Sequence, residues 1–84
     1  MTAVLLFPSI HYVLRAEKVL QQEGVAGSLI PVPHDLATEC GMAWGMPEGE
    51  VPAALRILEA AGLRPVAAWL KGETGWEPLS LDTV

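Results

Sequence analysis

The chain of 84 residues contains one cysteine, Cys40, and Gly41 follows it directly. A cysteine thiolate is a strong nucleophile, and its pKa falls where amides or positive charges surround it. A neighbouring glycine leaves room for a reagent to approach the sulfur. Cys40 is therefore a candidate for covalent chemistry. The alternative is that it packs as a small apolar residue, as free cysteines commonly do.

Two histidines, His11 and His34, are the side chains best suited to assist this thiol. An imidazolium beside the sulfur would stabilise the thiolate, whereas the carboxylate of Glu39 would raise the pKa of the thiol. Cys40 and the two histidines are also zinc-ligand types, but three ligands at these spacings match no zinc-finger pattern. The sequence therefore predicts no metal site. It marks no orienting residue or oxyanion hole either, so a carrier or binding protein is favoured over an enzyme, and enzymatic activity stays open.

The segment before the cysteine is typical of a strand, a helix and a second strand. Residues 3–7 form a short apolar run that suits a buried strand. Ser9 is a favourable N-cap for a helix that Gly24 ends. The predicted apolar positions of this helix are Ile10, Val13, Ala16 and Leu20. Residues 28–32 follow as a strand, and Pro31 predicts that this strand lies at a sheet edge, because proline cannot donate to a ladder.

The segment after the cysteine repeats this organisation. Residues 41–45 are predicted as a strand, a helix opens at residues 47–50, and residues 65–70 form a further strand. The predicted apolar stripe of this helix is Val51, Leu55, Leu58 and Ala61, with Gly62 as its stop. Residues 19–32 and 57–70 can be aligned so that helix end, glycine and strand coincide. The order βαββαβ predicts an α+β, ferredoxin-like split-βαβ fold, with two helices on one face of an antiparallel sheet.

Residues 1–72 are expected to form this single domain, with residues 73–84 as a tail or a short extra strand around Trp76. In a split-βαβ sheet the third strand begins at the end where the first strand finishes. We therefore expect Cys40 and Gly41 to lie near Ser9 and His11, at the N-terminus of the first helix. Free amides there carry a partial positive charge that favours an anion such as a thiolate.

Composition narrows the class of partner. The net charge is −5 and the five basic residues are scattered, so no basic footprint for nucleic acid or an anionic membrane is visible. No apolar run approaches the length of a membrane span, and the N-terminal segment lacks the features of a signal peptide. With a single cysteine and no internal disulfide, we expect a cytoplasmic protein.

The sequence resembles a family of small selenium/sulfur carrier-like proteins over about residues 3–70. The resemblance rests on the spacing from Pro31 and Pro33 to Cys40 and Gly41, and on the FPS-x-H start of the first helix. It implies a cysteine that carries sulfur or selenium as a persulfide or selenosulfide, with no cofactor, between donor and acceptor proteins. Two positions depart from the pattern of this family. His34 stands where an arginine is common, and Glu39 stands where a small polar residue is common. Both changes make the field around the sulfur less positive than the family pattern would.

Two hypotheses remain. In the first, Cys40 is a sulfur or selenium relay, with Ser9, His11, His34 and Gly41 as anion-stabilising or access-giving residues. In the second, the chain is a non-catalytic interaction or regulatory module with a structural cysteine, which binds a partner or a second copy of itself through the edge strand or through Trp76. The sequence leaves the oligomeric state, the chalcogen, the donor and the acceptor open.

Overall fold

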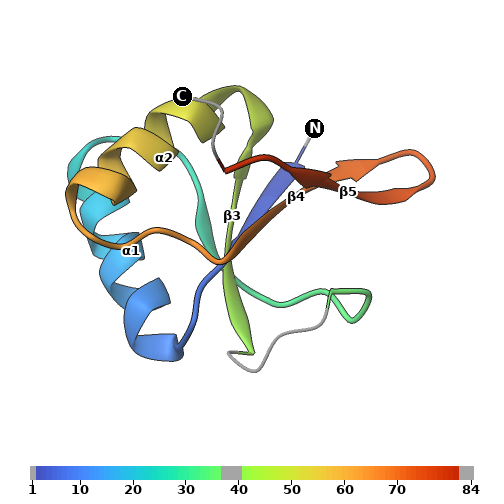
Figure 1. The fold of residues 1–84 in the computed structure, drawn as a ribbon, viewed down its shortest axis with the longest axis horizontal. Helices are drawn as coiled ribbons and strands as arrows, with labels where there is room; N and C mark the ends of the chain where they lie inside the picture. Colours follow the sequence, from blue (N-terminus) through green and yellow to red (C-terminus); the bar gives the residue numbers. More distant parts are fainter. Residues whose placement is uncertain (1, 37–40, 82–84) are drawn as a thin grey trace.

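The structure is a computed structural model that describes residues 2–36 and 41–81. Its elements in chain order are β1 (Thr2–Leu6), α1 (Ile10–Gln22), β2 (Ser28–Pro31), β3 (Met42–Pro47), the short 3₁₀ helix η1 (Glu48–Glu50), α2 (Val51–Ala60), β4 (Ala67–Gly72) and β5 (Gly75–Leu79). The strands form one sheet in the order β2-β3-β1-β4-β5, with every neighbouring pair antiparallel. The predicted ferredoxin-like α+β fold is confirmed, and β5 extends it beyond β4 (Figure 1).

The sheet separates two apolar clusters, because successive side chains of a strand point to opposite faces. Both helices cover the same face (Figure 1), and the larger core lies between them and the sheet. Trp44, Leu20 and Leu58 are completely buried in this core. A smaller cluster on the opposite face contains Val4 and Leu6. The members packed around them are Leu36, Ala43, Ile30, Val32, Ala67, Trp69 and Trp76.

The two helices end in the same way. After α1, Gly24 adopts φ +75° and donates to the carbonyl of Gln21, while the next residue, Val25, donates to Leu20 at 2.9 Å. After α2, Gly62 at φ +71° and Leu63 make the two equivalent bonds. This paired pattern is the Schellman motif, in which a left-handed glycine lets the chain turn back and satisfy the last carbonyls. Both predicted glycine stops are confirmed.

The repeat does not stay in register through the strands. Aligning Gly24 with Gly62 places Leu29 on Ala67, but Leu29 packs into the helix-side core and Ala67 into the opposite cluster. Strand pairing connects Leu29 to Trp44, Trp44 to Leu5, and Leu5 to Ala68. Ala68, rather than Ala67, therefore lies on the same face of the sheet as Leu29. The predicted alignment of the two strands is therefore wrong by one residue. A shift of one residue places every side chain of the second strand on the opposite face of the sheet from its aligned partner.

Several boundary residues differ from expectation. Ile10 is 38% exposed because it opens α1, and Ala61 is exposed because α2 has already ended at Ala60. The third strand runs to Pro47 rather than to residue 45. The predicted position of β2 at a sheet edge is confirmed, and the other edge strand, β5, also contains a proline, Pro78.

Candidate functional site

Gly41, directly before β3, lies at one end of the sheet. β1 and β3 are antiparallel, with Leu5 opposite Trp44, so β3 begins at the end where β1 leads into α1. β4 also begins there, because Val66 donates its amide to the carbonyl of Leu6 at 2.8 Å. Figure 1 shows the start of α1 and the start of β3 at the same end of the molecule. The predicted placement of the start of the third strand beside the end of the first is therefore confirmed for the described residues.

Cys40 and Glu39 lie outside the described residues, and Gly41 is the nearest described neighbour of the cysteine in the chain. Gly41 is exposed and has φ +79°, a backbone conformation that side-chain-bearing residues rarely adopt. Apart from its chain neighbours, no atom of the described residues lies within 4 Å of the position that a Cβ would take. Its carbonyl accepts a hydrogen bond of 3.1 Å from the amide of Val32. Position 41 is therefore open to solvent and fixed through its backbone.

The segment that follows β2 turns towards the face that the helices leave uncovered. The amide of Leu36 donates to the carbonyl of Pro33 at 2.9 Å and closes a tight turn, within which His34 is exposed. The side chain of Leu36 is only 6% exposed and packs with Val4 and Leu6 in the smaller cluster. Leu36, together with Val32, which packs against the same cluster, holds the segment against the sheet, and His34 belongs to this side of the molecule.

His11 and Ser9 belong to the other side. Ser9 occupies the predicted N-cap position, but its side chain makes no capping bond; instead its carbonyl accepts the amides of Tyr12 and Val13, each at 3.2 Å. His11, in the first turn of α1, is exposed. Figure 1 shows the start of α1 and the turn at residues 33–36 on opposite sides of the sheet. The structure thus brings Ser9 and His11 together and does not bring His34 to them.

Sequence reasoning missed Leu36 as the anchor of this segment. The available signal was a single leucine inside a polar loop, because an isolated apolar residue in such a context needs a place to be buried.

Within residues 2–36 and 41–81, no three His, Cys, Asp or Glu side chains gather in an arrangement that could hold a metal ion. Among the same residues, no helix is long and apolar enough to cross a membrane.

Comparison with known proteins adds one match. A family described as "Putative Se/S carrier protein-like" matches residues 2–69, which run from β1 into β4 and include Cys40 and Gly41. No curated protein and no solved structure gives a match. The match ends inside β4, so β5 lies beyond it. Since the match covers most of the chain, the protein belongs to this selenium/sulfur carrier-like family.

Proposed function

We propose that the protein carries a sulfur or selenium atom on Cys40 between a donor protein and an acceptor protein. In the loading step, the Cys40 thiolate attacks the outer chalcogen atom of a donor persulfide or selenosulfide. A bond forms between Sγ and that atom, the donor bond breaks, and the donor cysteine leaves as a thiolate. In the unloading step, an acceptor nucleophile takes the same atom and Cys40 leaves as a thiolate. Neither step has a net change of oxidation state, so no cofactor is needed.

The observation that carries this proposal is the family match across residues 2–69, which includes the only cysteine of the chain. The geometry of Gly41 supports it, because an open, exposed position beside the cysteine would allow two large partners in turn to reach the sulfur. A residue with a side chain at position 41 would be strained at φ +79° and would narrow that access.

We assign the remaining candidates supporting roles. Ser9 and His11 stand at the positive end of α1, where the helix dipole and the Ser9 hydroxyl would stabilise an anion that approaches from the end of the sheet. His34 would stabilise the thiolate from the opposite face. The supporting residues thus divide into two groups that can be tested separately.

The experiment is the rate of alkylation of the native protein with iodoacetamide as a function of pH, with the urea-unfolded chain as control. Because the chain has one cysteine, every modified molecule is modified at Cys40. We expect the midpoint of the native profile to lie below that of the unfolded chain, since an anion-stabilising site lowers the pKa of the thiol. Inorganic polysulfide should then add one sulfur atom to the native protein, detected by intact mass.

The matched control is Cys40→Ser, which should fold normally and take up no sulfur. His11→Gln should move the pH midpoint towards that of the unfolded chain if the α1 terminus stabilises the thiolate, and His34→Gln tests the other face in the same way. A native cysteine that reacts only when the chain unfolds would overturn the relay and leave the interaction-module hypothesis.

A further inference from the structure

A groove runs along one side of α2, far from the end of the sheet that carries Gly41. It lies between the start of this helix and the chain that leaves β5, and its volume is about 210 Å³. Its lining residues are Glu48, Val51, Pro52, Leu79 and Ser80. Val51 is buried in the core and Leu79 is half-buried, so the floor is apolar, while Glu48 stands exposed at the rim.

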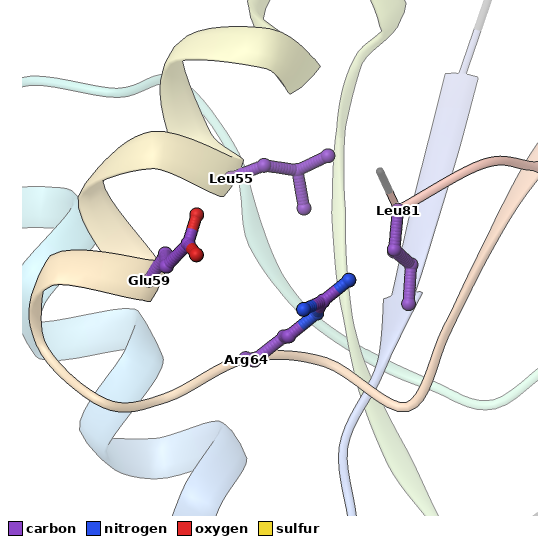
Figure 2. A pocket seen from close by; sticks show the side chains of 4 residues that line it. All are labelled: Leu55, Glu59, Arg64 and Leu81. Carbon is purple, nitrogen blue, oxygen red and sulfur yellow. The ribbon is translucent and has the colours of Figure 1, made fainter. Parts of the chain in front are cut away.

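A second, separate pocket lies on the same side of the helix. Residues 51, 52, 55 and 59 follow one another at helical spacing and share a face. Beyond Leu55 this face meets Arg64 and Leu81 around a much smaller space of about 10 Å³, and Figure 2 shows the side chains that line it. This side of α2 therefore has one larger pocket at the Glu48 end and a much smaller one beyond it.

The size of the pocket favours a side chain over a free small molecule. Small-molecule sites commonly enclose about 300–1,000 Å³, and the groove falls below that range. A space of this volume suits one large apolar side chain, and protein interfaces concentrate their binding energy in such buried anchors. The groove has the dimensions of an anchor site for another protein.

Charge selects the kind of partner. Glu48 lines the pocket at the start of α2, and the whole chain has a net charge of −5. Within the described part of the chain Glu48 forms no ion pair, so its carboxylate is available to a cation from outside. An acidic partner segment would be repelled here, whereas a lysine or arginine beside an apolar anchor would face an opposite charge.

We propose that this groove docks a partner protein through an apolar side chain flanked by lysine or arginine. The position leaves the cysteine end accessible, because β3 separates Gly41 from Glu48 and a strand of this length spans roughly 20 Å. The proposal concerns a surface made of described residues alone, and it stands whether or not Cys40 carries a chalcogen.

The test uses three synthetic peptides, acetyl-Lys-Phe-Lys-amide, acetyl-Glu-Phe-Glu-amide and acetyl-Lys-Gly-Lys-amide, titrated into the labelled full chain and followed by backbone-amide NMR. We expect the first peptide to shift the amides of Val51, Leu79 and Ser80 saturably. The second lacks the complementary charge and the third lacks the anchor, so each should bind several-fold more weakly. The substitution Glu48→Gln removes an exposed charge and should weaken the first peptide about threefold.

The matched control is Glu23→Gln, at the rim of a second groove lined by Val19, Glu23, Ile57, Ala60 and Ala61. This variant should bind the first peptide as the unaltered chain does. Equal binding of all three peptides, shifts confined to the second groove or the opposite sheet face, or no saturable shift at about 10 mM peptide would overturn the proposal. Concentration-dependent shifts of the same amides without peptide would assign the groove to a second copy of the chain and would also overturn it.

Discussion

The two βαβ halves of the molecule share a scaffold and differ in the segments beyond it. Each half has a helix that ends in a Schellman turn at a glycine, Gly24 or Gly62, and each then supplies a strand to the same sheet. The strand of the first half, β2, leads into the segment that carries Cys40. The strand of the second half, β4, leads into a tight turn and pairs with β5.

The difference shows where the fold leaves room for variation. In the first half, Val25 is separated from β2 by two residues, and in the second half Leu63 is separated from β4 by three. Because of the additional residue, each side chain of β4 points to the opposite face of the sheet from the side chain at the aligned position of β2. Hydrogen bonds hold both helix ends to one geometry. The linkers and the segments that follow β2 and β4 differ between the halves. The candidate cysteine follows β2, in one of these variable segments.

The largest expected effect comes from Leu20→Ala and Leu58→Ala, which truncate equivalent, completely buried side chains just before the two turns. Each should lower the free energy of unfolding by about 2–5 kcal/mol, because a cavity replaces lost packing. Urea unfolding followed by tryptophan fluorescence measures both. If the alanine variants do not fold, Leu20→Val and Leu58→Val keep the comparison measurable. A difference of several kcal/mol between the two sites would show that the halves do not share the core equally.

The next effect concerns Gly27, a glycine of the first half that has no counterpart in the second. A Cβ at Gly27 would lie 2.6 Å from Cζ2 of the buried Trp44 and 2.7 Å from the carbonyl oxygen of Gly45, at φ +152°. Gly27→Ala should therefore cost at least about 2 kcal/mol from clash and backbone strain together. The aligned position in the second half is Pro65, so no equivalent clash exists there.

Gly49→Ala is the control for this prediction. Gly49 does not have a positive φ. Apart from its chain neighbours and the backbone of its own helical turn, no described atom lies within 4 Å of the position that a Cβ would take. Its replacement should leave the urea midpoint unchanged or slightly raised. If Gly27→Ala behaved like Gly49→Ala, the close approach of this backbone to Trp44 would be refuted.

The smallest effect is expected from Gly24→Ala and Gly62→Ala. Both positions have open space around the virtual Cβ, so the cost is only that of placing an alanine in a left-handed conformation, about 1–2 kcal/mol. The two losses should be equal within the error of thermal unfolding measurements. Unequal losses would mean that the two Schellman turns, although alike in geometry, do not contribute alike to stability.

The sequence allowed much of the scaffold to be predicted, because the relevant signals are local. The glycine stops and the edge position of the strand containing Pro31 follow from backbone chemistry alone, and both are confirmed. The strand shift was missed because Ala67 and Ala68 are both small and apolar, so no alternation reveals which of them faces the helices. The shift is caused by the one-residue difference between the linkers. This difference determines which side chains face the helices only once both strands pair in one sheet.

The candidate site was harder to predict, because its members come from different faces of the sheet. The topology correctly brought the start of β3 to the end where α1 begins. It could not show that the segment after β2 turns to the opposite face, since that direction is set by the burial of Leu36 among side chains of β1. Ser9 and His11 therefore approach from one side and His34 from the other, and the role of each stays a prediction.

The prolines of the two outer strands bear on how such a molecule behaves in a crowded solution. The amide of Val32 points inward to Gly41, so the nitrogen of the preceding Pro31 points away from the sheet. Pro78 lies in the other outer strand, β5, and likewise has no amide hydrogen. A free sheet edge is a template on which strands of neighbouring molecules can add and start an aggregate. A missing donor in each outer strand opposes such growth, so the protein should have little tendency to aggregate through its sheet edges.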